Sequence, residues 1–170
     1  MDRRTFGLLT VSAALTAGCA NKFQTYSGPQ VTSVVVNKGA RRMYLLHHEE
    51  VLKEYKFGLG FTPVGDKKIR GDGKTPEGTY YIDRRNPNSA FHLSLGISYP
   101  NAADRAEAKA LGKEPGGDIF IHGQPNLFAD RRKARKRGSD WTAGCIAVKN
   151  REIEEIYAMV QTGTTITLRA

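Results

Sequence analysis

The sequence DWTAGCIAV at residues 140–148 carries one of only two cysteines in this chain of 170 residues, and it follows an apolar run, DIFIHG, at 118–123. The apolar run predicts a strand that ends at His122. Gly144 precedes Cys145, and its lack of a side chain lets backbone N–H groups approach a developing oxyanion. A cysteine becomes a nucleophile when a base or a positive charge stabilises its thiolate. These residues allow two interpretations, a catalytic Cys145–His122 pair or a buried structural cysteine.

The composition is that of a globular chain that most simply forms one domain. Hydrophobic residues make up 39% and charged residues 25%, and 26 Lys and Arg against 17 Asp and Glu give a net charge of +9. The length suffices to bury a hydrophobic core. The 18 glycines and the recurring short Val/Ile/Tyr-rich runs favour a turn-rich β architecture. The positive charge favours anionic partners, such as a membrane surface, an anionic wall polymer or nucleic acid.

The first 20 residues, MDRRTFGLLTVSAALTAGCA, have the layout of an export signal. Two arginines precede an uncharged stretch at 6–18, which is short for a bilayer span of ~20 residues. The quartet TAGC resembles a lipobox, and DRRTFGLL resembles a twin-arginine signal. We therefore expect a signal peptide at 1–18, lipidation of Cys19, and a polar tether at 19–30. The alternative is a short hydrophobic N-terminal helix with an unrelated cysteine.

This layout predicts an exported protein, periplasmic or otherwise extracytoplasmic, that is attached to a membrane through the lipid on Cys19. Nucleic acid is an intracellular partner, so the signal argues against nucleic-acid binding.

The remaining chain, 31–170, predicts a single domain that is mainly β (α+β), with one or two short helices. Asn101 and Asn150 are the expected N-caps of the two helices, and Gly112 and Gly163 follow their ends. Strands are expected at 31–37, 42–47, 50–60, 79–83, 91–98, 118–122 and 164–169, and helices at 101–112 and 151–160. The first two strands flank a KGAR turn and predict a hairpin.

Two further motifs do not predict a cofactor or a metal. The segment GDGKT at 71–75 resembles a phosphate-binding loop, but Lys68 occupies the place of the first glycine and Pro76 blocks the helix that must follow. We interpret it as a surface turn. The segment HHEE at 47–50 would place neighbouring side chains on opposite faces of a strand. The chain has no CxxC or HExxH motif, so we expect neither a metal nor a cofactor.

The blocks IFIHG and DWTAGCIAV resemble the L,D-transpeptidase catalytic domain of the YkuD type, whose signature is His-Gly followed by Ser/Thr-x-Gly-Cys and an apolar residue. The resemblance extends to GDGKTPEGTYYI and to ISYPNAADRAEAKALGKEPGGDIFIHG, so that it covers most of 31–170. The murein-active, YafK-like members are the most similar. The resemblance implies a mixed β-sandwich or barrel with one or two short helices packed on it.

The resemblance also implies an activity on peptidoglycan stem peptides. In this family the cysteine thiolate attacks the carbonyl between an L-centre and a D-residue and forms a thioester. An amine then completes a crosslink or attaches a protein, whereas water would give an L,D-endopeptidase. A non-catalytic wall-binding lipoprotein that keeps the fold is the alternative from another class.

The family's site residues map onto specific positions of this chain. The resemblance implies Cys145 as nucleophile, His122 as base and later acid, and the Gly123 carbonyl as the group that orients the imidazole. The remaining implied residues are the oxyanion-hole N–H groups of Ala143, Gly144 and Cys145, and the loop-supporting or substrate-contacting Thr142, Asp140 and Trp141. Many members carry His immediately before the Gly-Cys pair and Arg two residues after the cysteine, where this chain has Ala143 and Ala147.

A basic run, RRKARKR at 131–137, lies between the two expected catalytic residues, and six of its seven residues are basic. One interpretation is a solvated helix or loop face. The other is a contact for anionic wall polymer or lipid headgroups through Arg131, Arg132, Lys133 and Arg135.

Overall fold

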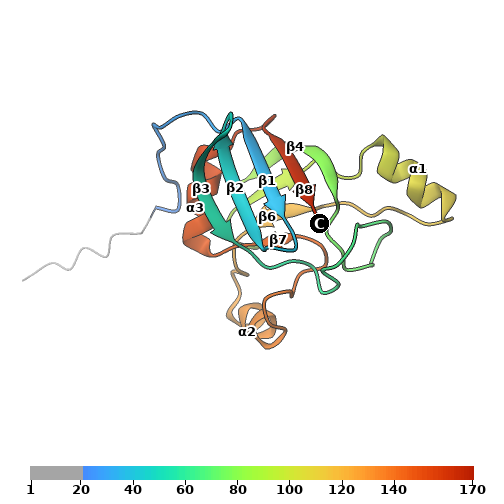
Figure 1. Ribbon diagram of the computed structural model, residues 1–170. Helices are drawn as coiled ribbons and strands as arrows, with labels where there is room; N and C mark the ends of the chain where they lie inside the picture. Colours follow the sequence, from blue (N-terminus) through green and yellow to red (C-terminus); the bar gives the residue numbers. More distant parts are fainter. Residues whose placement is uncertain (1–20) are drawn as a thin grey trace, which may run out of the picture.

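The structure is a computed structural model, shown in Figure 1, and it describes residues 21–170. The predictions for the signal peptide, for Cys19 and for the first residues of the tether lie outside the described residues. In chain order the elements are β1 (Ser33–Asn37), β2 (Arg42–His47), β3 (Glu50–Lys56), β4 (Gly78–Asn86), β5 (Ser94–Ile97), α1 (Ala102–Ala110), β6 (Phe120–His122), α2 (Phe128–Lys136), β7 (Ile146–Ala147), α3 (Asn150–Met159) and β8 (Thr165–Arg169).

The strands form one mixed sheet in the order β3-β2-β1-β8-β4-β5-β6-β7. The predicted hairpin is confirmed, because β1 pairs antiparallel with β2 and Val35 lies opposite Tyr44. Two pairs are parallel: β1 with β8 and β6 with β7. The β1–β8 pair places the last strand of the chain in the middle of the sheet. The β6–β7 pair places the loop that carries Cys145 beside the strand that ends at His122.

The two edges of the sheet are joined by the chain that leaves β3. Gly58 bridges Ala147 of β7, and Gly60 bridges Thr142. The Gly58 N–H donates to the Ala147 carbonyl at 2.8 Å. A Cβ at Gly60 would lie 2.0 Å from the Gly73 carbonyl oxygen, so only glycine permits this approach. The sheet is therefore barrel-like, and the expectation of a mainly β fold with packed helices is confirmed.

The core lies inside the curved sheet and beneath α3. Burial alternates along β1, β2 and β8, as a period of two requires. Ile153 and Ile156 of α3 are fully buried, whereas α1 and α2 each bury a single alanine and project from the domain (Figure 1). Fully buried side chains of the strands and their connections include Val34, Met43, Leu45, Leu59, Tyr80, Ile82, Leu93, Leu95, Ile97, Ile121, Ile146 and Ile166.

The helices differ from the sequence prediction in two respects. Residues 21–170 contain three helices rather than one or two, because the basic run contributes to α2. The predicted N-cap at Asn101 is confirmed, since its side chain accepts from the Ala103 and Asp104 N–H groups. The predicted N-cap at Asn150 is wrong. Lys149 occupies that position, and the Asn150 side-chain oxygen instead accepts a hydrogen bond from the Gln124 N–H at 2.8 Å.

Residues 21–30 lie along the surface of the domain. The Lys22 ammonium donates to the Pro87 carbonyl at 2.5 Å, and the Phe23 ring lies 6.3 Å from the ring of Tyr157. Over residues 21–170, none of the helices is both long enough and apolar enough to cross a membrane.

Candidate active site

The parallel pair β6–β7 places His122 and Cys145 on one face. Ile121 pairs with Ile146 and His122 pairs with Ala147, so that Cys145 precedes β7 on the same side of the ladder as Ala147. Because alternate residues of a strand share a face, Cys145 and His122 point to the same side. Both residues line a hollow of about 600 Å³ and a smaller one of about 290 Å³. The structure therefore brings the two predicted catalytic residues together.

The imidazole of His122 is buried and fixed in one orientation. Its Nδ1 lies 2.7 Å from the Gly123 carbonyl oxygen, which can only accept, so Nδ1 carries the proton and Nε2 keeps its lone pair. The ring packs against Phe91 and Trp141, with centroid distances of 4.5 and 5.6 Å. Burial lowers the pKa of His122 to about 4, although the hydrogen bond to Gly123 opposes this shift. The imidazole is therefore neutral near pH 7 and can act as a base.

Gly123 has a steric role in addition to its carbonyl. A Cβ there would lie 2.8 Å from the Asn150 side-chain oxygen and 2.9 Å from the Phe91 carbonyl oxygen. The Gly123 N–H also donates to the Phe91 carbonyl at 3.0 Å. The turn after β6 is thus held closely against its neighbours, and this fixes the carbonyl that orients the imidazole.

Cys145 is partly exposed, and its thiol lies 3.5 Å from the Asp118 carbonyl oxygen. Burial raises the pKa of the Cys145 thiol, and the Asp118 charge adds to this effect. The Phe120 N–H and the Lys67 charge oppose it. The resting site therefore pairs a neutral thiol with a neutral imidazole. A nucleophilic role for this thiol would require its proton to move to His122 during attack, by general-base activation rather than from a preformed ion pair.

Thr142 stabilises the loop that carries the nucleophile. Its hydroxyl donates to the Cys145 carbonyl at 2.7 Å and accepts from the Gly144 N–H at 3.2 Å. The Gly144 N–H is therefore already engaged. The N–H groups of Ala143 and Cys145 have no acceptor among residues 21–170, so these two donors remain for an oxyanion. Gly144 has φ +133°, and a Cβ there would lie 2.6 Å from the Lys74 carbonyl oxygen.

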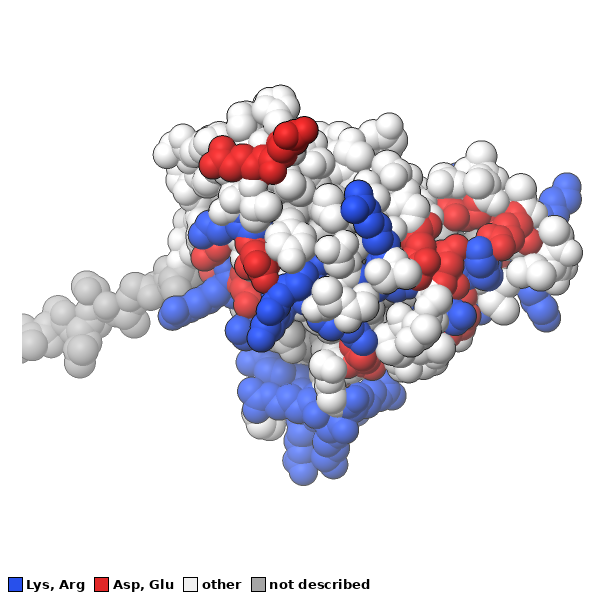
Figure 2. Space-filling model, viewed as in Figure 1, with Lys and Arg blue, Asp and Glu red and all other residues white. Residues whose placement is uncertain are grey.

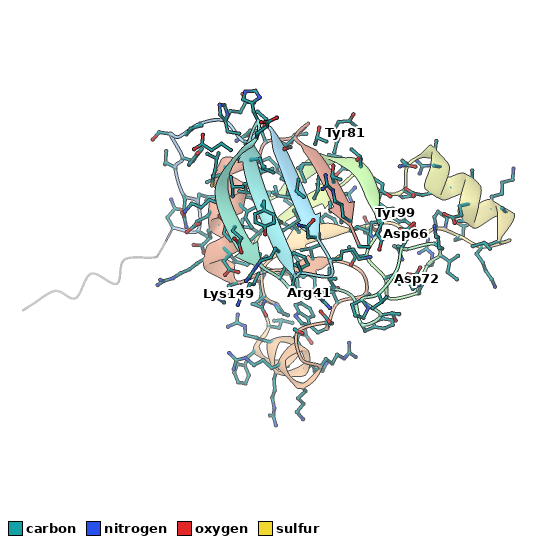
Figure 3. All side chains as sticks on the ribbon, viewed as in Figure 1. Arg41, Asp66, Asp72, Tyr81, Tyr99 and Lys149 are labelled. Carbon is teal, nitrogen blue, oxygen red and sulfur yellow. The ribbon has the colours of Figure 1, made fainter. Side chains whose placement is uncertain are left out.

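Asp140 anchors the start of the same loop. Its carboxylate oxygens lie 2.5 and 2.7 Å from the guanidinium nitrogens of Arg41. Figure 3 shows Arg41 at the end of the sheet that is nearest to α2. One oxygen also accepts from the Leu59 N–H at 2.9 Å. Asp140 therefore positions the loop, and Trp141 then packs edge-on against the imidazole of His122.

The prediction of a surface turn at 71–75 is wrong for Thr75, which lies in the interior. Thr75 is fully buried and donates its hydroxyl hydrogen to the Gly144 carbonyl at 2.8 Å. The buried Lys38 ammonium donates to the carbonyls of Gly65 and Thr75 at 2.7 and 2.8 Å and pairs with Glu77 at 2.8 Å. This segment therefore supports the loop that carries Cys145. The resemblance of GDGKTPEGTYYI to the family was the sequence signal for its importance.

The predicted basic residues lie on α2, where Figure 2 shows Lys and Arg side chains gathered on one projection of the molecule. Arg131 donates to the Pro125 carbonyl at 3.1 and 3.2 Å, and Lys133 lies 3.4 Å from Asp130. Arg132 and Arg135 are exposed. Lys133 lines the larger of the hollows that Cys145 and His122 share, so α2 forms one wall of the candidate site.

The arrangement contains the elements of thiol-dependent acyl transfer: a cysteine, a neutral imidazole with a fixed tautomer, and two unengaged backbone N–H groups beside the sulfur. A Cys-His pair of this kind on a barrel-like sheet is typical of cysteine acyltransferases and peptidases.

Residues 32–168 match the family model of the YkuD L,D-transpeptidase catalytic domain, and the chain belongs to this family. It is similar to YafK of Escherichia coli (strain K12), which its name assigns to the L,D-transpeptidases, with 29% identity over 159 residues. That alignment covers 91% of this chain and 56% of YafK. The chain thus spans about half the length of the curated relative that it matches.

Solved structures show the same fold. The helical cell shape determining protein Pgp2 of Campylobacter jejuni is 31% identical with a TM-score of 0.59, over 89% of this chain and 52% of Pgp2. Bd1075 of Bdellovibrio bacteriovorus is 24% identical with a TM-score of 0.53, over 82% of this chain and 48% of Bd1075. An L,D-transpeptidase of Mycobacterium smegmatis is 15% identical with a TM-score of 0.52, over 82% of this chain and 59% of that chain, which is a likeness of fold.

Proposed function

We propose that this protein is a peptidoglycan-modifying cysteine L,D-transpeptidase that acts on stem peptides through a Cys145 thioester. The observation that carries the proposal is the placement of Cys145 and His122 on one face of the β6–β7 pair, with Nδ1 of the imidazole bound to the Gly123 carbonyl. Membership of the YkuD family and the likeness to a cell shape determining protein support peptidoglycan as the substrate.

In the proposed first step, the Cys145 sulfur attacks the carbonyl carbon of the peptide bond that joins an L-centre to a D-residue. The thiol proton moves to Nε2 of His122, and the carbonyl oxygen becomes an oxyanion that the Ala143 and Cys145 N–H groups stabilise. The C–N bond then breaks, Nε2 protonates the leaving amine, and the acyl group remains on sulfur as a thioester.

In the second step, an acceptor attacks the thioester and His122 takes up its proton. An amine gives a new peptide bond and hence a crosslink or an attached protein, whereas water gives a free carboxylic acid. The Cys145 sulfur leaves as a thiol in both cases. Transpeptidation and L,D-hydrolysis therefore share the same acyl-enzyme and differ in the nucleophile that reaches it.

The decisive experiment incubates the purified full chain with tetrapeptide-containing muropeptides and identifies the products by mass spectrometry. The control is Cys145→Ala, checked for folding by its thermal unfolding curve. Dimeric muropeptides are the expected product of a transferase, and shortened or uncrosslinked stems would identify a hydrolase. Identical, unchanged muropeptides with both proteins would refute the enzyme and leave the non-catalytic wall-binding lipoprotein.

We further propose that the protein is exported and attached to a membrane by a lipid on Cys19. This proposal rests on the sequence of residues 1–20. Cells fed a radiolabelled fatty acid should incorporate label into the wild-type chain and not into Cys19→Ser. Equal labelling of the two proteins would contradict the anchor.

We propose that α2 contacts an anionic wall polymer or lipid surface beside the active site. Arg131 already holds the Pro125 carbonyl, so the test neutralises Arg132, Lys133 and Arg135 together. We expect the triple Gln variant to bind isolated sacculi more weakly at low salt, with the difference disappearing at high salt.

The matched control for α2 neutralises three exposed cations on or next to α1: Arg105, Lys109 and Lys113. It changes the net charge by the same amount on the other projecting helix. Equal binding by the two triple variants would show that only the total charge matters and would refute a contact that is specific to α2.

A further inference from the structure

A third hollow, of about 530 Å³, opens beside Cys145 on the side of the domain that carries α1. Ala143 and Cys145, which carry the proposed oxyanion donors, line this hollow. Lys67, Arg70 and Tyr99 line it as well. Figure 3 shows Tyr99, together with Asp66 and Asp72, on this side of the sheet. Because Cys145 lines this hollow, a peptide whose scissile carbonyl lies at Cys145 can extend the groups on one side of that bond into it.

The hollow contains three cationic side chains, and two of them already have partners. Lys67 is buried, and its ammonium lies 2.8 Å from an Asp72 carboxylate oxygen. The Arg84 guanidinium lies 2.9 Å from the Asp118 carboxylate. Within residues 21–170, by contrast, the side chain of Arg70 has no hydrogen bond and no carboxylate at ion-pair distance. Among the cations that line this hollow, Arg70 is therefore the one whose side chain is free to bind a ligand.

The backbone holds Arg70 in place even though its side chain is unpaired. The Asp72 carboxylate accepts the N–H groups of Lys68, Ile69 and Lys74 at 2.8, 3.0 and 3.1 Å, which fixes the turn around it. The Arg70 N–H donates to the Glu114 carbonyl at 2.7 Å. A Cβ on Gly116 would lie 3.2 Å from the Arg70 Cα, so the two segments are closely packed. The turn fixes the backbone of Arg70, whereas its exposed side chain is ordered only when it binds a ligand.

The residues next to the nucleophile in sequence provide no charge of their own. Ala143, Gly144, Ile146 and Ala147 surround Cys145. Recognition of a charged group on the substrate must therefore come from another segment of the chain. The turn that carries Arg70 is such a segment, because Arg70 lines the same hollow as Cys145, whereas Lys133 of α2 lines the hollow that Cys145 shares with His122.

We propose that Arg70 binds a carboxylate of the stem peptide and thereby selects substrates that carry a free acid next to the scissile bond. This inference rests on the proposed function and names the group that the site recognises. A guanidinium binds a carboxylate through two parallel N–H···O hydrogen bonds, a geometry that an amide cannot reproduce. The carboxylate has two sources in a stem peptide: the C-terminus of the D-residue, or a free carboxyl on the residue that provides the scissile carbonyl.

The test measures kcat/KM of the full chain with three otherwise identical tetrapeptide substrates. One has both acids free, one has the C-terminal carboxyl amidated, and one has the carboxyl of the third residue amidated. Against the free acid we expect Arg70→Ala to lose about 10- to 100-fold, as for other charge-assisted hydrogen bonds, and Arg70→Lys to lose less. Amidation of the recognised carboxyl should cost the wild type a similar factor and should cost Arg70→Ala little more.

The amide that abolishes the difference between wild type and Arg70→Ala identifies the carboxylate. The matched control is Arg105→Ala, which removes the same charge from α1, outside the hollow beside Cys145. It should change kcat/KM by less than about twofold, as expected for a screened surface charge. An equal loss by Arg70→Ala on all three substrates, or no loss, would overturn the proposal.

Binding measurements separate this proposal from the proposed function. The dissociation constant of each peptide is measured with Cys145→Ala and with the Cys145→Ala, Arg70→Ala double variant, neither of which turns the peptide over. Weaker binding of the free acid by the double variant, with no such difference for one amide, supports Arg70 even if the wild type shows no turnover. Identical dissociation constants for the two variants would refute the role of Arg70 even if turnover is observed.

Discussion

The buried imidazole of His122 predicts a specific dependence of stability on pH. Its pKa is about 4 in the folded protein, compared with ~6.5 for an exposed histidine. The unfolded chain therefore binds a proton at this residue in a pH range where the folded chain does not. Above pH ~6.5 this residue does not change the free energy of unfolding. As the pH falls from ~6.5 towards 4, the free energy of unfolding decreases, because protonation of His122 favours the unfolded chain.

The size of the effect follows from the two pKa values. Each unit of pKa difference corresponds to ~1.4 kcal/mol, so His122 should reduce the free energy of unfolding by about 2 kcal/mol at pH 5 and about 3 kcal/mol at pH 4, relative to pH 8. The substitution His122→Asn removes the titrating ring. Its side-chain N–H can still donate to the Gly123 carbonyl, as Nδ1 does.

The assay is urea unfolding of wild type and His122→Asn at intervals between pH 8 and pH 4. All other titrating groups are common to both proteins, so the difference between their free energies of unfolding isolates His122. We expect the wild type to lose stability relative to the variant as the pH falls, by the amounts given above. Parallel profiles, or a wild type that gains relative stability in acid, would refute the inference that the folded site holds a neutral imidazole.

Three further predictions concern the nucleophile and its loop. The rate of Cys145 alkylation by iodoacetamide, measured in the Cys19→Ser protein, should still increase with pH above ~8.5, because burial raises the pKa of the thiol. A rate that reaches a plateau below pH ~6 would instead indicate a preformed thiolate–imidazolium ion pair. Thr75→Val should lower the free energy of unfolding by about 1–3 kcal/mol, because it removes the hydrogen bond to the Gly144 carbonyl. Thr79→Val, at an exposed position, should lower it by less than ~0.5 kcal/mol. Equal effects would contradict the inference that Thr75 supports the loop that carries Cys145. Gly144→Ala should reduce activity far more than Gly78→Ala. Gly78 has nearly the same φ (+131° compared with +133°), but its new methyl group would lie 3.4 Å or more from its neighbours, so similar losses would show that backbone strain alone matters.

The sequence predicted much of the sheet because its evidence is local. Alternation of apolar residues and the KGAR turn identify the hairpin of β1 and β2, and the spacing of Ile153, Ile156 and Tyr157 identifies the buried face of α3. The residues around Cys145 and His122 left a catalytic pair and a buried structural cysteine open, and the resemblance of the two motifs to the YkuD family favoured the pair. The pairing of β6 with β7 then explains how residues that are 23 positions apart meet.

The supports of the site were not predictable because their partners are distant in sequence. Lys38 follows β1 and binds the carbonyls of Gly65 and Thr75, so its burial depends on a loop that begins more than 20 residues later. Polar composition alone made the 71–75 segment look like a surface turn, yet Thr75 is fully buried. Composition predicts exposure only when no distant group satisfies the polar atoms, and here Lys38 and Gly144 satisfy them.

The quartet TAGC occurs at 16–19 and again at 142–145, and the structure describes only the second copy. There each residue has a separate physical reason. The Thr142 hydroxyl links Gly144 to Cys145, Ala143 leaves its N–H without an acceptor, and Gly144 alone tolerates both its backbone angle and the approach of the Lys74 carbonyl. None of these requirements applies to a signal-processing site, which needs small residues for access to the cysteine. With Cys19 as the proposed lipidation site and Cys145 as the proposed nucleophile, the two copies would answer unrelated demands for small residues before a cysteine.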